Sequence, residues 1–184
     1  MSPNVPVHAD RWLDRARRGH GDGFDELYKW LGGAVRGFAA SRGAADPEGV
    51  VNDVFLKAFR SLDTFDGDSA GFRNWIFAMT RNQLIDDHRR STRRPVTADA
   101  EIPDQPTTGA DEIALDQLGN ERVARLLSTL TEAQREVVVL RIIADLSVSD
   151  VAEIVGRPPT AVKRLQARAL RTLEREISAE GVSE

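Results

Sequence analysis

Cysteine is absent from this sequence of 184 residues, which excludes disulfides, thiolate metal sites and thiol nucleophiles. The three histidines, His8, His20 and His88, lie far apart and show no metal-ligand spacing. No apolar run approaches the roughly 20 residues needed to cross a bilayer, and no signal peptide is evident. We therefore expect a cytoplasmic protein without membrane insertion, bound metal or cofactor.

Groups that could carry catalysis are also scarce. The chain shows no phosphate-binding loop and no cluster of metal ligands. The neighbouring carboxylates Asp86 and Asp87 would point about 100° apart on a helix, so they do not converge on one ligand. We predict no catalytic residues and no enzymatic activity.

Positive charge is in the minority, with 25 Lys and Arg against 29 Asp and Glu and a net charge of −4. From Pro95 to Asp116 there is no Lys or Arg at all. The same stretch carries six acidic residues, Asp99, Glu101, Asp104, Asp111, Glu112 and Asp116. Such a segment buries too little apolar surface to fold alone and is typical of an extended linker. It is either a plain tether or an acidic chain that imitates nucleic acid within a basic channel.

The C-terminal part has the signals of a helix-turn-helix. Thr131 with Gln134 forms a capping box that opens an apolar helix, and Ser147 with Asp150 opens a second, short one. Gly156 fits a left-handed helix stop, and the two prolines that follow fit the first turn of a third helix. Two helices, a tight turn and a third helix predict a unit whose last helix enters the DNA major groove.

The third helix is basic although the chain is acidic. From Thr160 to Arg175 a single acidic residue, Glu174, stands against five basic ones, Lys163, Arg164, Arg168, Arg171 and Arg175. Phosphate neutralisation supplies much of the affinity of free DNA-binding domains, which are therefore mostly basic. An acidic chain with local basic islands indicates DNA binding as part of a larger assembly.

The N-terminal half is predicted to be helical throughout. We expect one helix to end near Ser41, a second to run from the cap Asp46 to Leu62, and a long third helix to run over 71–90. Trp75 has helical spacing with other apolar residues, which favours a core position over a stacking platform for bases. The end of the long helix is basic through Arg81, Arg89, Arg90, Arg93 and Arg94.

Two segments resemble a known family. DPEGVVNDVFLKAF (46–59) and LDTFDGDSAGFRNWIFAMTRNQLIDDHRR (62–90) are similar to region 2 of extracytoplasmic-function (ECF) sigma factors, and the helix-turn-helix is similar to their region 4. The resemblance covers about residues 10–94 and 115–178. It implies an all-α fold of two small helical domains, 10–94 and 115–178, joined by an extended acidic linker over 95–114.

The resemblance also implies the function and the partners. Such proteins bind core RNA polymerase, through the β′ clamp helices and the β flap, and direct it to particular promoters. The helix 46–62 corresponds to the surface that grips the clamp helices, with Asn52 and Asp53 as its polar candidates. An anti-sigma factor that holds the protein inactive is a further expected partner.

The resemblance assigns two DNA-reading surfaces. For the −10 element the candidates are Phe65, Asp68, Ser69, Arg81, Asn82, Arg89 and Arg90. The loop 65–70 would form a pocket for an extruded base, Asn82 would hydrogen-bond a base, and the arginines would hold phosphates. For the −35 element the candidates are Lys163, Arg164, Gln166, Ala167, Arg168 and Arg171.

Within the −35 set, Arg164 and Arg168 are the leading base readers and Arg171 is assigned to phosphate. Gln166 stands where many relatives have an aliphatic residue, so it could add a base contact. The buried side of this helix is then expected to be Val162, Leu165, Ala169 and Leu173.

An alternative is a stand-alone helix-turn-helix regulator whose N-terminal half senses a signal or dimerises. It accounts for 115–178 but leaves the motifs FDGDSA and RNQLIDDHRR unexplained. Capture by core polymerase distinguishes the two hypotheses.

Overall fold

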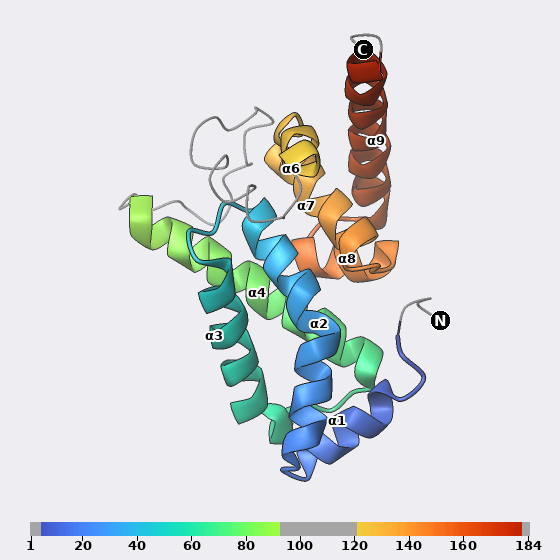
Figure 1. Ribbon diagram of the computed structural model, residues 1–184. Coiled ribbons are helices and arrows are strands. Elements are labelled where there is room, and N and C mark those ends of the chain that lie inside the picture. The colour runs from blue at the N-terminus through green and yellow to red at the C-terminus, as the bar shows by residue number, and fades with distance from the viewer. Residues whose placement is uncertain (1–4, 93–120, 182–184) are drawn as a thin grey trace.

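The computed structural model describes residues 5–92 and 121–181, where all regular structure is helical (Figure 1). The N-terminal elements are α1 (Ala9–Arg17), α2 (Gly21–Ser41), α3 (Pro47–Arg60), the 3-10 turn η1 (Leu62–Thr64) and α4 (Ser69–Thr92). The C-terminal elements are α6 (Glu121–Ser128), α7 (Glu132–Val138), the π-helical turn η3 (Val139–Ile143), α8 (Val148–Val155) and α9 (Pro159–Gly181). The all-α prediction is confirmed. The acidic linker predicted over 95–114, with Arg93 and Arg94, lies outside the described residues.

Local signals define the helix-turn-helix as predicted. The Thr131 hydroxyl accepts the N–H of Gln134 at 3.3 Å, and the Gln134 side chain accepts the N–H of Thr131 at 3.0 Å. Ser147 and Asp150 form the same reciprocal pair at 3.1 Å in each direction. Each box satisfies two backbone donors that a helix start leaves free. Gly156 ends α8 with φ 66° and ψ 34°, in the left-handed region.

Helix α2 is the centre of the N-terminal half, where it packs against α1, α3 and α4. Its buried side repeats at helical spacing through Leu27, Leu31, Val35 and Phe38. Helices α3 and α4 also pack against each other. The long basic helix is therefore held along the surface of a small helical bundle.

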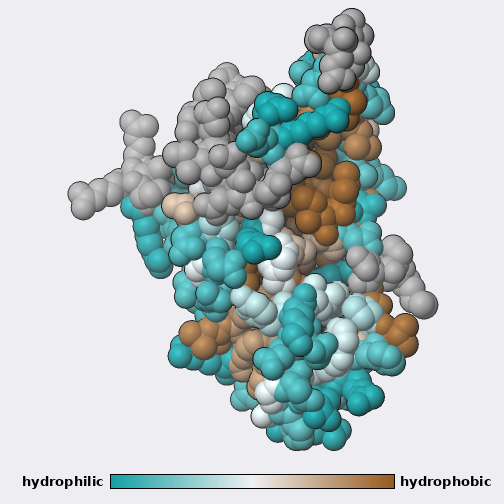
Figure 2. Space-filling view, in the orientation of Figure 1, coloured by the Kyte–Doolittle hydropathy of each residue, from teal (hydrophilic) through white to brown (hydrophobic). Residues whose placement is uncertain are grey.

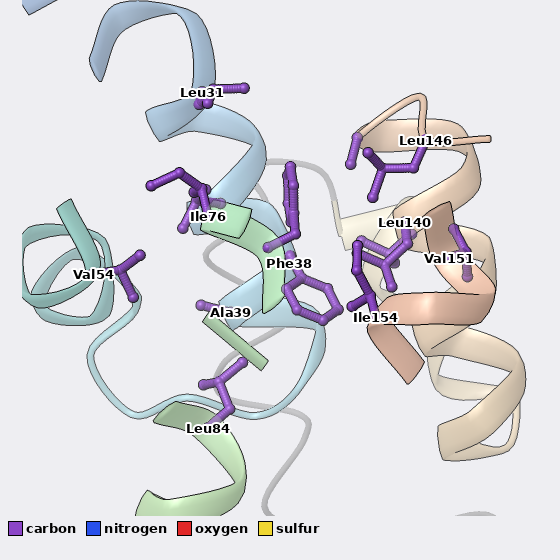
Figure 3. Packing of buried hydrophobic residues seen from close by; sticks show 14 of the residues in the cluster. Leu31, Phe38, Ala39, Val54, Ile76, Leu84, Leu140, Leu146, Val151 and Ile154 are labelled. Carbon is purple, nitrogen blue, oxygen red and sulfur yellow. The ribbon is translucent and has the colours of Figure 1, made fainter. Parts of the chain in front are cut away.

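The two halves of the molecule share one hydrophobic core. Helix α2 contacts α7 and η3, and α4 contacts α8. Figure 3 shows Phe38 on the side of the N-terminal core that faces Leu140 and Ile154, and all three side chains are buried. This packing sets α9 in a defined position relative to α4.

None of the helices described is long and apolar enough to cross a membrane. Across residues 5–92 and 121–181, no group of His, Asp and Glu side chains is arranged to hold a metal ion.

Candidate nucleic-acid interface

Helix α9 is anchored by the stripe that the sequence predicts. Val162 and Ala169 are fully buried, and Leu165 and Leu173 pack against the same core. The helix contacts α6, α7 and α8 along this side. Its opposite side is therefore turned to solvent at a fixed orientation.

The exposed side of α9 carries five of the six residues predicted for the −35 element, Lys163, Arg164, Ala167, Arg168 and Arg171. Arg168 and Arg171 line a surface hollow between the start of α7 and α9, together with Gln134, Thr172 and Arg175. Lys163 and Arg164 lie nearer the N-terminus of the helix. The basic residues thus divide into an N-terminal pair and a cluster of three guanidinium groups.

Gln166, the sixth candidate, is tied to the body of the domain. It is half-buried, and its Oε1 accepts a hydrogen bond from Nε of Arg141 at 3.3 Å. Arg141 also donates to the carbonyl oxygen of Leu146. The structure therefore gives Gln166 a role in fastening α9 to the η3 turn.

The loop before α4 is compact and partly covered. The half-buried Phe65 ring stacks on Trp75, with centroids 4.9 Å apart and an interplanar angle of 15°. Asp68 caps α4, since its Oδ1 accepts the N–H of Gly71 at 2.8 Å. Ser69 is buried. Trp75 is half-buried and packs against the core, as expected from its spacing.

Three residues of α4, Trp75, Asn82 and Arg89, recur at intervals of seven. This spacing places them on one side of the helix. Asn82 and Arg89 are exposed, as is Arg90. Two helical turns, about 10 Å, separate Trp75 from Asn82. Trp75, which stacks on Phe65 of the loop, thus lies on the same side of α4 as the exposed Asn82 and Arg89.

Arg81 faces a different direction from Asn82, because adjacent positions on a helix differ by about 100°. Its Nε donates to Oε1 of Glu136 on α7 at 2.9 Å, and the two side chains are only 18% and 4% exposed. Asn74 lies seven positions earlier and donates to Oδ1 of Asp150 on α8 at 2.8 Å. Helix α4 therefore has one side turned to solvent and another paired with the C-terminal half.

Charge complementarity extends along this internal contact. Arg42 pairs with Glu132 at 2.6 Å, and Arg73 lies buried near Asp150 and Asp145. Burial lowers the pKa of Arg73, which the two carboxylates oppose. Burial acts to raise the pKa of Asp150, but hydrogen bonds from Ser147 and Asn74 and the charge of Arg73 outweigh it, so the pKa lies below its ordinary value.

The candidate polymerase surface on α3 is held by hydrogen bonds from its neighbours. Asn52 and Asp53 are both exposed. The Tyr28 hydroxyl of α2 donates to Oδ1 of Asn52 at 3.3 Å, and Gln83 of α4 donates to Oδ2 of Asp53 at 3.2 Å. Burial and the charge of Glu48 raise the pKa of Tyr28, which keeps this donor protonated.

Two sets of residues were not identified from the sequence. Glu136 pairs with Arg81, and Asp10 and Arg17 of α1 contact the loop before α4. The partners of Glu136 and Arg17 are 55 and 50 positions away, a separation at which no local pattern indicates a contact. The one sequence signal for the α1 contacts is the seven-residue spacing of Asp10 and Arg17, which places both on the same side of a helix.

Comparison with known protein families matches residues 24–94 to Sigma-70 region 2 and residues 120–173 to Sigma-70, region 4. The chain is 31% identical over 168 residues to the ECF RNA polymerase sigma factor BldN of Streptomyces coelicolor, covering 89% of this chain but only 63% of BldN. It is 32% identical over 171 residues to the ECF RNA polymerase sigma factor RpoE of Cereibacter sphaeroides, covering 90% of this chain and 93% of RpoE.

Among solved structures, the chain is similar to CnrH in its complex with the cytosolic domain of CnrY. The TM-score is 0.65 at 29% sequence identity, and the match covers 93% of this chain and 98% of the CnrH chain. The similarity therefore extends over both halves of the molecule.

Proposed function

The chain belongs to the ECF group of the sigma-70 family, whose members are initiation factors and not enzymes, and we propose how its own residues divide the reading of a promoter. As an alternative sigma factor it directs RNA polymerase to specific promoters. In our proposal residues 10–94 bind polymerase and the −10 element, 95–114 connect, and 115–178 bind the −35 element. This activity takes place in the cytoplasm, together with the polymerase.

One observation carries the proposal: an acidic chain exposes basic residues on two separate helices, at the end of α4 and along α9. Each island can contact phosphate, but the net charge of −4 weakens binding of the free chain to DNA. Attachment to core polymerase would supply the missing affinity. A regulator that binds DNA by itself would not need polymerase to supply part of its affinity.

For the −35 element we assign base reading to the N-terminal part of α9. Residues near the start of a recognition helix reach the base edges in the major groove. Arg164 lies there with Lys163 and is exposed, so it is the leading base reader. Arg168 shares a hollow with Arg171 and Arg175; Arg175 is paired with Glu176, so Arg168 and Arg171 are the two guanidinium groups that we assign to phosphate there. Ala167 allows close approach of the helix to the groove.

For the −10 element we assign the exposed side of α4 and the preceding loop. Asn82 can offer a donor and an acceptor to an extruded base. Arg89 and Arg90 follow on the exposed end of the helix and suit the strand backbone, which carries no sequence information. Phe65 and Asp68 define the shape of the loop through stacking and helix capping.

For polymerase we assign two surfaces. Asn52 and Asp53 on α3 would contact the β′ clamp helices. Figure 2 shows hydrophobic side chains gathered on the C-terminal half, where Val123 of α6 and Leu170 and Ile177 of α9 are between 37% and 44% exposed. An apolar surface of this kind suits the β flap.

The complex of CnrH with CnrY supports a similar inhibitory partner for this chain.

The proposal has a consequence for the arrangement of the two halves. Arg81 is assigned to a phosphate of the −10 strand, but here it pairs with Glu136. One guanidinium edge cannot serve both partners at once. Because the Arg81 side chain is also only 18% exposed, we propose that the halves separate locally when Arg81 binds DNA.

Transcription in vitro with purified core polymerase, followed by sequencing of transcript starts, tests the assignment. The two exposed asparagines form a matched pair. Asn82→Ala is expected to reduce permanganate reactivity of the −10 thymines while polymerase binding is retained. Asn52→Ala is expected to weaken polymerase binding and to leave melting by the assembled holoenzyme unchanged. Tight, specific binding of duplex promoter by the free chain at physiological salt would contradict the proposal and favour the stand-alone regulator.

A second measurement distinguishes base reading from phosphate contact on α9. Arg164→Ala is expected to cost about 1–3 kcal/mol of discrimination at one −35 position. Arg171→Ala should weaken all −35 sequences nearly equally. Arg168→Ala should weaken all −35 sequences equally, as Arg171→Ala does, if Arg168 contacts phosphate. It should reduce discrimination at one position, as Arg164→Ala does, if Arg168 reads a base. A uniform loss for Arg164→Ala would contradict its assignment.

A further inference from the structure

Two side chains of α1 hold the loop that precedes α4. Nη2 of Arg17 donates to the carbonyl oxygens of Phe65 and Gly67, at 3.0 and 2.6 Å. Asp10 accepts the backbone N–H of Ser69 through Oδ1 at 2.8 Å. One helix thus supplies a donor to the loop and an acceptor to the first residue of α4, directly after the loop.

Arg17 also covers the aromatic side chain of the loop. Its guanidinium carbon lies over the Phe65 ring, 5.5 Å from the centroid, and the Arg17 side chain is 29% exposed. A Cβ on Gly67 would lie 2.7 Å from the Phe65 ring, so the ring is folded tightly onto the loop backbone. Arg17, Phe65 and Trp75 form one contiguous set of contacts.

The geometry of α1 explains how one short helix reaches both ends of the loop. Asp10 and Arg17 are seven positions apart, which places them on the same side and about 10 Å apart along the axis. Asp10 also lies at the N-terminus of α4, where a carboxylate is favoured by the free N–H groups. Hydrogen bonds from the backbone and side chain of Ser69 lower the pKa of Asp10, so it is ionised at neutral pH.

We propose that Arg17 and Asp10 are positioning residues for −10 recognition: α1 acts as a brace that fixes the backbone of the loop 65–68 before DNA arrives. This inference rests on the proposed role of that loop in receiving an extruded base. A pocket whose backbone is already ordered loses less conformational freedom on binding and discriminates better between bases. Both hydrogen bonds of Arg17 go to loop carbonyls, which distinguishes it from a phosphate ligand.

The test compares Arg17→Ala with Arg18→Ala in the holoenzyme. Both changes remove one positive charge from adjacent, exposed positions, but the hydrogen bonds to the loop carbonyls come from Arg17. Binding and melting are measured on four promoters that differ only in the extruded −10 base, both as duplexes and with the −10 region already unpaired. Arg17→Ala is expected to reduce the preference for the best base about two- to tenfold on both templates, the factor that one hydrogen bond contributes. Arg18→Ala should leave the preference unchanged.

Asp10 gives the second arm. Asp10→Ala is expected to reduce the same preference, and Asp10→Asn, which keeps an acceptor oxygen for the Ser69 N–H, is expected to restore most of it. Polymerase binding and −35 discrimination should be unaffected in all variants. These readouts separate loop positioning from a general loss of folding, which would lower them together.

Several outcomes would overturn the inference. An equal loss on all four bases, with the slope of log affinity against log salt reduced by about one, would make Arg17 a phosphate contact. The base preference could be unchanged in Arg17→Ala and abolished in Phe65→Ala. This result would show that the loop functions without the brace, and the proposed function would stand. Absence of any −10 preference in the wild-type holoenzyme would refute the proposed function itself.

Discussion

Glycines that look alike in the sequence differ in what the fold requires of them. Gly156 has φ 66°, which a residue with a Cβ adopts only at a cost. Gly33 lies within α2, and a Cβ there would meet no heavy atom within 4 Å. Gly23 allows close packing, since its Cβ would lie 2.5 Å from the backbone nitrogen of Ala16. Each glycine therefore has its own predicted response to substitution.

Gly156→Ala is expected to lower the free energy of unfolding by about 1–2 kcal/mol, the cost of left-handed backbone for a residue with a side chain. Gly33→Ala should raise it by about 0.5–1 kcal/mol, because alanine is the better helix former. Urea denaturation of both variants measures the difference. A lower free energy of unfolding for Gly33→Ala would contradict this prediction, because it would mean that the added Cβ is not accommodated on this surface of α2.

Arg73 is a second residue whose environment departs from its sequence type. It is 2% exposed, and none of its three guanidinium nitrogens has a hydrogen-bond partner within the described part of the chain. A buried polar group without partners costs about 1–3 kcal/mol. Arg73→Met keeps the apolar stem, so the free energy of unfolding is expected to stay unchanged or to rise. A loss above about 1 kcal/mol would show that attraction to Asp145 and Asp150 outweighs the cost of burial.

At the scale of elements, α8 depends on one carboxylate for two purposes. Asp150 closes the capping box with Ser147 and accepts the side-chain N–H of Asn74 from α4. The start of α8 and its contact with the N-terminal half are therefore coupled. The capping box of α7, by contrast, is formed by Thr131 and Gln134 alone.

This coupling predicts a pH dependence. Burial acts to raise the pKa of Asp150, but the net effect of its surroundings in the folded state is to lower this pKa from its ordinary value of 3.8. The stabilisation by its carboxylate is therefore complete above that value and is lost as the pH falls below it through the folded-state pKa. The difference in Tm between wild type and Asp150→Asn is expected to be constant near neutral pH and to shrink below pH 3.8. A constant difference down to pH 2 would contradict this role.

At the scale of the whole molecule, acidic residues of the C-terminal half meet basic residues of the N-terminal half. Glu136 is almost fully buried beside Arg81, and Glu132 pairs with Arg42. Removing one partner of a buried pair leaves the other charge without compensation. The arrangement of the two halves thus depends on both members of each pair.

Arg81→Ala is expected to lower the free energy of unfolding by about 1–3 kcal/mol, and Arg81→Ala with Glu136→Ala to recover part of that loss. Arg89→Ala, an exposed arginine on the same helix, should change it by less than about 0.5 kcal/mol. Equilibrium unfolding of the wild type, Arg81→Ala, Glu136→Ala and the double variant gives the coupling energy, and Arg89→Ala serves as the control. A coupling near zero would show that Arg81 and Glu136 do not hold the halves together.

The sequence by itself determined the three helices of the helix-turn-helix, α7, α8 and α9, and the buried stripe of α9. The capping boxes, the stop at Gly156 and the period of Val162, Leu165 and Ala169 are local signals, which depend on residues within a few positions of one another. The basic side of α9 could be predicted for the same reason, because residues three and four positions apart lie on one side of a helix. The family resemblance added the assignment of regions that local pattern could not provide.

The tertiary structure decided which of these residues are free to bind. Arg81 and Asn82 are neighbours in sequence, yet one is paired with Glu136 and the other is exposed. Gln166 is tied to Arg141, and the loop before α4 is braced by Arg17 and Asp10. The Arg81, Gln166 and loop contacts join positions 25 to 59 residues apart. Contacts at that separation depend on how helices pack, and packing energy is spread over the whole core, so no local pattern indicates them.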